Sequence, residues 1–254
     1  MLTALPDNKK VYFASDFHLG VPDYDKSLVR ERRLVAWLES IKHDAAEIYL
    51  VGDLFDFWFE YKTVIPKYYT RLLGKLAELR DMGIPITFFT GNHDMWMFGY
   101  FEKELGIPVI RQPIERVING KKFYIAHGDG LGPGDHGYKF IKKVFASKLC
   151  QWAFRWLHPD IGIGIANYFS HSSRKANGEK DYVFLGEDNE WLVIYSRDIL
   201  KTAHHDYFIY GHRHLPMDIE LQPGSRYINL GDWIKHFTYA VFDGEKMELK
   251  EFAG

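Results

Sequence analysis

The chain has 254 residues, a length that suits one large α/β domain better than two domains. Its 46% hydrophobic and 26% charged residues are ordinary for a folded protein and exclude disorder and fibrous repeats. The 32 Lys and Arg against 34 Asp and Glu give a net charge of −2, which weighs against a protein that coats nucleic acid. A single cysteine excludes an internal disulfide, so we expect a reducing compartment. The N-terminus has no basic stretch followed by an apolar one, and no apolar run approaches about 20 residues, so we expect no signal peptide and no membrane-spanning helix.

Short apolar runs separated by helical patterns predict an α/β fold with parallel strand pairs. The first expected strands are 10–15, 47–51, 86–90, 122–126 and 207–210. Apolar residues at helical spacing predict helices around 34–41 and 68–79, between the first three strands. Three more short strands are expected at 226–230, 239–242 and 247–252, and we expect this β-rich end on a second sheet.

The stretch that begins at residue 138 breaks this alternation. Apolar residues recur there every three or four positions and predict one helix: Tyr138, Ile141, Val144, Phe145, Leu149, Trp152 and Trp156. A second helical piece is expected over 161–169. We therefore expect an inserted helical segment, at about 138–175, within a single domain of residues 1–254.

Basic residues are interleaved with the aromatic residues of this insertion, namely Lys139, Lys142, Lys143, Lys148 and Arg155. A basic, aromatic, amphipathic helix suits an anionic membrane surface or an acylated ligand. A helical hairpin packed on the domain core, or a dimer interface, explains the same pattern equally well. Both interpretations stay open at the level of the residues.

Polar clusters follow five of the predicted strands. They are Asp16-Phe17-His18, Gly52-Asp53, Gly91-Asn92-His93-Asp94, His127-Gly128-Asp129 and Gly211-His212-Arg213-His214. Each fragment alone is typical of a turn, since Gly, Asn and Asp all favour turns. Ligands of open α/β sheets bind beyond the carboxyl ends of the strands, so five such fragments in this position predict one shared site.

Carboxylate, amide and imidazole groups together favour Mn²⁺, Fe²⁺, Zn²⁺ or Co²⁺ over Mg²⁺ and Ca²⁺, which prefer oxygen ligands. The number of candidate ligands exceeds the need of one ion and indicates two ions that share a carboxylate. Two ions about 3.5–4 Å apart activate water and hold a phosphoryl group during displacement.

This series of fragments resembles the calcineurin-like metallophosphoesterase family. The resemblance implies a four-layer α/β sandwich, with two packed mixed β-sheets flanked by helices and a dinuclear site at one edge. It implies one ion on Asp16, His18, Asp53 and His214, and a second on Asp53, Asn92, His127 and His212. It also implies that His93 assists the leaving group together with Asn92, and that Asp94 orients His93. From the residues themselves, Asp56 is expected to orient a metal-binding histidine.

Within the family, the chain is most similar to the UDP-2,3-diacylglucosamine pyrophosphohydrolases of lipid A synthesis. The similarity rests on residues 13–20, 52–58, 173–180 and 229–233. It implies that the insertion caps the site and holds acyl chains. It also implies that the phosphates contact Asn92, His93 and His212, and that the sugar and its substituents contact Asp135, Tyr138, Ser173, Asn177 and Lys180. The typical members have Arg at the position of His93.

The expected activity is therefore hydrolysis of UDP-2,3-diacylglucosamine to UMP and 2,3-diacylglucosamine 1-phosphate, with two divalent ions, Mn²⁺ first among them. The expected place is the cytoplasm, peripherally on the inner face of a membrane and without nucleic acid, with the oligomeric state open. A different metallophosphoesterase activity is the alternative: a nuclease, a nucleotide phosphodiesterase or a protein phosphatase. A non-catalytic interaction module of the same fold is a third, which the full set of ligand residues disfavours.

Overall fold

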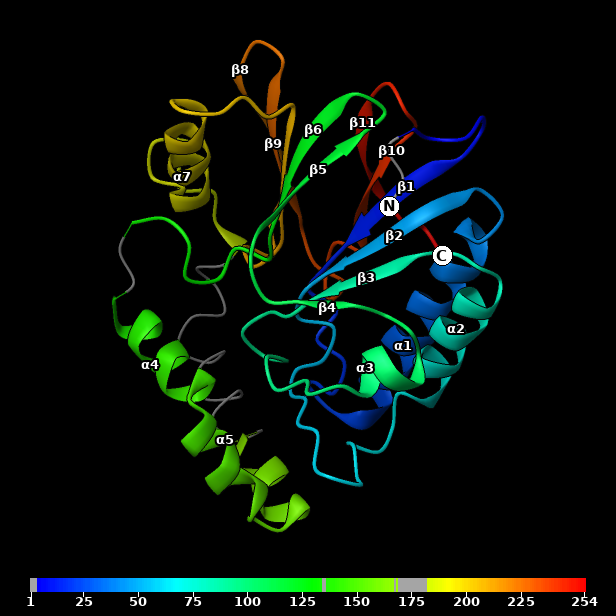
Figure 1. The fold of residues 1–254 in the computed structure, drawn as a ribbon, viewed down its shortest axis with the longest axis vertical. Helices are drawn as coiled ribbons and strands as arrows, with labels where there is room; N and C mark the ends of the chain where they lie inside the picture. The colour runs from blue at the N-terminus through cyan, green and yellow to red at the C-terminus, as the bar shows by residue number, and fades with distance from the viewer. Residues whose placement is uncertain (1–3, 134–135, 167, 169–181) are drawn as a thin grey trace.

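The computed structural model describes residues 4–133, 136–166, 168 and 182–254 and forms two β-sheets packed face to face (Figure 1). The first sheet has six strands, in the order β11 (Met247–Glu251), β10 (Thr238–Phe242), β1 (Lys10–Ala14), β2 (Ala45–Val51), β3 (Ile86–Phe89) and β4 (Val109–Ile110). The second has five strands, in the order β5 (Ile114–Ile118), β6 (Lys121–Ile125), β7 (Tyr207–Tyr210), β9 (Ser225–Leu230) and β8 (Pro216–Gln222).

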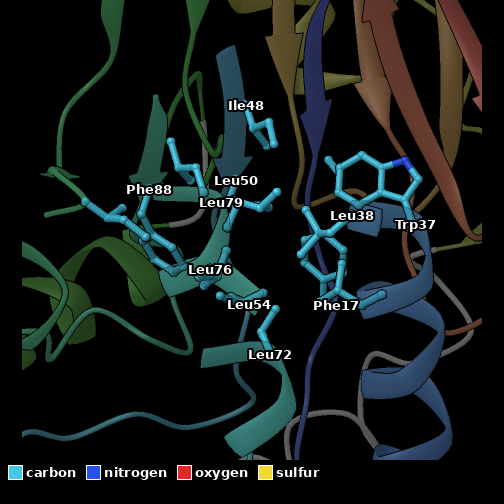
Figure 2. Close-up of a cluster of buried hydrophobic side chains, with 14 of the residues drawn as sticks. Phe17, Trp37, Leu38, Ile48, Leu50, Leu54, Leu72, Leu76, Leu79 and Phe88 are labelled. Carbon is cyan, nitrogen blue, oxygen red and sulfur yellow. The ribbon is translucent and has the colours of Figure 1, made fainter. Parts of the chain in front are cut away.

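Helices cover both outer faces, so the molecule has four layers, as the resemblance implied. Three helices lie on the first sheet, namely α1 (Tyr24–Ile41), α2 (Thr70–Asp81) and α3 (Tyr100–Glu104), and α7 (Trp191–Leu200) lies on the second (Figure 1). Figure 2 shows part of the core between the first sheet and its helices, to which Trp37 and Leu76 contribute from the helices and Leu50 from the sheet. Two further apolar clusters fill the space between the sheets and the space under α7.

The predicted parallel pairs are present. β1, β2, β3 and β4 run parallel to one another, and so do β6, β7 and β9. Parallel strands of one sheet end at the same edge, and Figure 1 shows that the loops after β1, β2 and β3 meet there. This edge lies close to the loops that follow β6 and β7, which prepares one site from both sheets.

The expectation for the C-terminal strands was only partly correct. β9 joins the second sheet, but β10 and β11 join the first, where β10 pairs antiparallel with β1. The burial of β10 explains its position, because Ala240 and Phe242 pack between the sheets whereas Val241 packs toward the helices. A strand that is apolar on both faces needs a covered place, and the edge beside β1 offers one.

The insertion contains two helices where the spacing predicted one. They are α4 (His136–Ala146) and α5 (Lys148–Arg155), followed by a helical stretch over 159–166. Ser147 separates α4 from α5 because its backbone is extended, with φ −66° and ψ 125°. Among the described residues, no helix is long and apolar enough to cross a bilayer.

Two phenylalanines attach the insertion to the body. Phe154 packs against Phe59 and Trp96, with ring centroids 4.7 and 4.8 Å away. The indole nitrogen of Trp96 donates a hydrogen bond of 2.8 Å to the carbonyl oxygen of Phe145. Figure 1 shows α4 and α5 standing away from both sheets, at the end where the loops after β1, β2 and β3 meet.

Helix α2 starts with a cap that comes from another helix. Its N-cap residue, Tyr69, makes no side-chain cap, and Glu31 of α1 instead accepts hydrogen bonds of 2.9 and 3.1 Å from the backbone nitrogens of Arg71 and Leu72. The Glu31→Ala variant should lose about 1–2 kcal/mol of unfolding free energy in urea titrations, because buried N–H groups at the helix end lose their acceptor.

The matched variants are Glu31→Gln, which keeps the acceptor oxygen, and Glu39→Ala, which removes an exposed glutamate of the same helix. Glu31→Gln should recover most of the loss, and Glu39→Ala should change stability much less. An equal loss in the two alanine variants would contradict the capping role.

Candidate metal centre

The loops that carry the predicted ligands are joined by backbone hydrogen bonds. Asp16 N donates to Gly52 O at 3.1 Å, and His18 N donates to Asp53 O at 2.9 Å. Gly211 N donates to the carbonyl oxygen of His127 at 3.0 Å in the second sheet. Each loop is thus positioned by the strand before it and by a neighbouring loop.

Among the described residues, three groups of side chains bring ligand atoms within 4.8 Å of one another. They are Asp16 with His18 and His214, Asp53 with His127 and His212, and His18 with Asp56 and His93. The first two groups are subsets of the two ligand sets that the family resemblance implied. Asp53 Oδ2 lies 3.2 Å from His127 Nε2 and 3.8 Å from His18 Nε2, so its carboxylate stands between the two groups.

The group around Asp16 has the donor arrangement of a cation site. His18 Nε2 and His214 Nε2 lie 3.0 Å apart, and Asp16 Oδ1 lies 3.2 Å from His214 Nε2. This oxygen is buried and has no well-oriented hydrogen-bond donor among the described residues. A cation between the two nitrogens and this oxygen would satisfy all three, since a buried carboxylate oxygen without a well-oriented donor is costly.

The group around Asp53 has the same character. His127 Nδ1 donates to the carbonyl oxygen of Val51 at 2.8 Å, which leaves Nε2 facing Asp53 and the side-chain oxygen of Asn92, 3.4 Å away. Burial opposes a charge on His127, yet the Asp53 carboxylate raises the pKa of this imidazole to about 10. Without a metal, His127 is therefore protonated at Nε2, the nitrogen that would bind a divalent ion.

Asp16, Asp53 and His212 are in the protonation states that metal binding requires. Burial alone would raise the pKa of Asp16, but the nearby imidazoles of His18 and His214 hold this pKa well below its usual value. Burial is likewise outweighed at Asp53, where nearby His127 and His93 lower the pKa. Burial and the neighbouring His127 lower the pKa of His212 to about 4, so this imidazole is neutral at neutral pH.

The backbone at the ligands is strained. Asp16, His18, Asp53, His212 and His214 all have positive φ, between 44° and 68°. This left-handed region costs a non-glycine residue about 1–3 kcal/mol in such settings, and strained residues of this kind cluster at functional sites. Their occurrence at five of the seven predicted ligands points to a site that the surrounding structure is built to hold.

Two glycines of the motifs are needed for close approach. A Cβ at Gly91 would overlap Asp53 Oδ1 and the Asp53 backbone nitrogen, and a Cβ at Gly211 would overlap Asp16 Oδ2 and Ser15 Oγ. Both carboxylates therefore lie directly against a neighbouring loop. The glycines of the Gly-Asn-His-Asp and Gly-His-x-His fragments make room for the ligands rather than for a turn.

Two buried arginines hold the ligand loops, and the sequence analysis missed both. Arg30 Nη1 donates to the carbonyl oxygens of Phe17, His18 and Val21 at 2.8 to 3.3 Å. Arg213, between the two histidines of its loop, makes a two-point pair with the buried Glu190 at 2.8 and 2.9 Å. Such buried pairs position a loop more than they stabilise a fold.

His93 and Asp94 differ from their expected relation. The carboxylate of Asp94 accepts hydrogen bonds from the backbone nitrogens of Gly91, Leu54 and Phe55. His93 Nδ1 instead donates to the carbonyl oxygen of Asp56 at 3.0 Å and lies 3.4 Å from Asp56 Oδ1. Through these backbone donors Asp94 joins two ligand loops, and it is Asp56 rather than Asp94 that contacts His93 Nδ1.

Four of the expected sugar contacts lie outside the described residues, namely Asp135, Ser173, Asn177 and Lys180. Tyr138 falls on α4, but its side chain is also outside them. Asp56 Oδ1 lies 3.5 Å from His18 Nδ1, and its role in orienting a metal-binding histidine stays a prediction.

Gly91→Ala should disturb the centre without a general loss of fold. The added methyl group must displace Asp53, so stabilisation by Mn²⁺ should fall from about 3 kcal/mol, at a concentration about 100 times Kd, to near zero. Thermal unfolding with and without Mn²⁺ measures this difference.

The control for this variant is Gly74→Ala in α2, where an added Cβ meets nothing within 4 Å. It should stabilise the chain slightly, since Ala is preferred over Gly in helices, and should leave the Mn²⁺ effect intact. A Gly91→Ala protein that Mn²⁺ stabilises as much as the parent would show that this contact is not needed.

Comparison with known proteins agrees with this geometry. The sequence profile of the calcineurin-like phosphoesterase family matches residues 9–216. A UDP-2,3-diacylglucosamine hydrolase of Porphyromonas gingivalis is 41% identical, over 95% of this chain and 97% of its own. A UDP-2,3-diacylglucosamine hydrolase of a Shewanella species is 26% identical, over 95% and 96%.

Among solved structures, Vps29 of Entamoeba histolytica in complex with zinc aligns with a TM-score of 0.43 and 12% identity, over 94% of this chain and 89% of its own. The profile spans the strands and loops that build the centre, from β1 to the loop that carries His214. With this match and the 41% identical relative, the chain belongs to the calcineurin-like metallophosphoesterase family.

Proposed function

We propose that the protein hydrolyses the pyrophosphate bond of UDP-2,3-diacylglucosamine and releases UMP and 2,3-diacylglucosamine 1-phosphate. The observation that carries the proposal is the 41% identity to a UDP-2,3-diacylglucosamine hydrolase over nearly the full length of both chains. Such a relative covers the insertion as well as the metal centre. The site chemistry agrees, because a phosphoryl group between two cation sites suits hydrolysis of a diphosphate.

The residues present fit two divalent ions, and we propose Mn²⁺ as the native metal. Asp16, His18 and His214 would hold one, His127, His212 and Asn92 the other, and Asp53 would contact both. When bound, such ions activate water as a nucleophile and neutralise charge on phosphoryl oxygens. The mixed nitrogen and oxygen donors fit Mn²⁺, Fe²⁺, Zn²⁺ or Co²⁺ better than Mg²⁺.

The chain's own groups would orient the diphosphate and supply the proton. Water attacks the phosphorus of the uridylyl half, the bond from that phosphorus to the bridging oxygen breaks, and the bridging oxygen leaves with the sugar phosphate. His93 is fixed through Nδ1 by Asp56, so only Nε2 remains to donate a proton or a hydrogen bond to a phosphate oxygen. The backbone N–H of His93 donates to Asp53 Oδ1 at 2.9 Å, which holds this histidine beside the metal centre.

Asp53→Ala should abolish turnover, with UMP release falling by more than about 100-fold, because both sites lose a ligand. Chromatographic assay of UMP from the acylated substrate measures the loss, and far-UV circular dichroism checks the fold. Asp81→Ala is the control, since Asp81 is exposed at the end of α2. Normal activity of Asp53→Ala would refute the mechanism.

The helical insertion is proposed to cap the site and to hold the acyl chains of the substrate at a membrane. None of the described residues of α5 is buried, and Trp152 and Trp156 are 58% and 76% exposed. Lys148 and Arg155 lie on the same helix. Aromatic and basic residues together bind anionic lipid surfaces, so we propose peripheral binding at the inner membrane face, in the cytoplasm.

Trp152→Ser combined with Trp156→Ser should weaken binding to vesicles of anionic phospholipid by about tenfold, because each exposed indole contributes buried apolar area at a membrane. Hydrolysis of the acylated substrate should fall with it, whereas hydrolysis of bis-p-nitrophenyl phosphate should not. Vesicle sedimentation and the two assays measure these effects.

The control for the tryptophan variant is Tyr24→Ser, which removes an aromatic side chain that is 53% exposed on the body. Vesicle binding unchanged by the tryptophan variant would contradict the membrane proposal. A dimeric parent that becomes monomeric on this substitution, as seen by analytical ultracentrifugation, would identify the face as a subunit interface instead.

A further inference from the structure

The metal centre has two flanks with different neighbours. On the side of His127, the insertion reaches the centre, because Lys142 of α4 pairs with Asp129 at 2.5 Å and also donates to its carbonyl oxygen at 3.0 Å. On the side of His214, the neighbours come from elsewhere in the chain. They are Tyr182, Lys235 and His236, and none of them has a role in the ligand sets or in the sugar contacts described above.

This second flank is fixed to the metal-binding loop. Asp232 is fully buried and accepts hydrogen bonds from the hydroxyl of Tyr182 at 2.8 Å and from the backbone nitrogens of Lys235 and His236 at 3.0 Å each. The next residue, Trp233, donates its backbone N–H to the carbonyl oxygen of Asp16 at 3.0 Å. Asp232 and Trp233 therefore tie this cluster to the loop that carries Asp16.

The flank presents aromatic rings and a cation. The ring of Tyr182 lies 6.0 Å from that of His214 and 5.8 Å from that of His236. The ammonium group of Lys235 stands 3.4 Å over the Tyr182 ring, and Lys235 is exposed. The carboxylate of Asp232 is buried, so Lys235 is the charged group of this cluster that solvent reaches. Such a combination binds a planar base by stacking on a ring and by charge-assisted hydrogen bonds from the ammonium group to the carbonyl oxygens of the base.

A diphosphate that joins a nucleoside to an acylated sugar has two unlike ends. With its phosphates at the metal centre, the bound substrate extends its two ends from the centre in different directions. The insertion flank offers apolar surface to the acylated end, which leaves the other flank for the nucleoside. We propose that Tyr182, Lys235 and His236 bind the nucleoside monophosphate half of the substrate beside His214. This assignment rests on the proposed function and adds the residues that recognise the nucleotide half of the substrate.

The test uses inhibition of a generic reaction, so it does not depend on the lipid substrate. The Mn²⁺-loaded full chain hydrolyses bis-p-nitrophenyl phosphate, and the inhibition constants of UMP and of inorganic phosphate are measured side by side. In Lys235→Ala, the constant for UMP should rise about tenfold, the usual scale for losing one charge-assisted contact, whereas that for phosphate should change less than twofold. Lys235→Glu should raise the UMP constant further.

The control is Lys246→Ala, an exposed lysine on the turn between β10 and β11 that pairs with Glu248. It should leave both constants unchanged. The proposal is overturned if UMP fails to inhibit the parent, if Lys235→Ala leaves the UMP constant unchanged, or if phosphate and UMP weaken equally. A parent that binds UMP through Lys235 but releases none from the acylated substrate would keep the nucleotide site and refute the proposed substrate instead.

Discussion

The structure depends on holding two buried carboxylates, those of Asp16 and Asp53, among imidazole rings. Burial favours the neutral acid, yet the histidines around both carboxylates keep their pKa values low. Two buried negative charges therefore persist at this site. Only positive charge at short range makes that arrangement tolerable. The ligand groups are therefore preorganised for cations. The left-handed backbone at these ligands is the conformational cost of that preorganisation.

The order of polar fragments after strands was enough to predict which loops meet, because parallel strands deliver their ends to one edge. The same order says nothing about what holds the loops. Arg30 lies in α1, where an arginine is ordinarily exposed, and Glu190 is 23 residues from its partner Arg213. The acceptor for His93 is the backbone carbonyl of Asp56, an atom that every residue carries. Such supports follow from tertiary packing, which single-sequence patterns do not contain.

The fold follows the same division. Strands buried on both faces, such as β1 and β3, were predicted from apolar runs, whereas β5 and β8 were missed. Those two lie at the edges of the second sheet and alternate exposed with half-buried residues, so their composition resembles that of a loop. Helical periodicity found the insertion but not its break at Ser147, because the apolar spacing continues across it. Helical periodicity shows which face of a segment is apolar, but it does not detect a single residue with an extended backbone.

His93 limits what the metal centre alone can recognise. Its ring lies 4.8 Å from that of His18, and with Nδ1 held by Asp56 it can offer a phosphate one nitrogen only. An arginine in this place would offer a two-point fork and grip the diphosphate by itself. With a single-point contact at the centre, discrimination between diphosphates must come from groups farther out. The insertion beside His127 and the aromatic, cationic cluster beside His214 are the described surfaces placed to supply it.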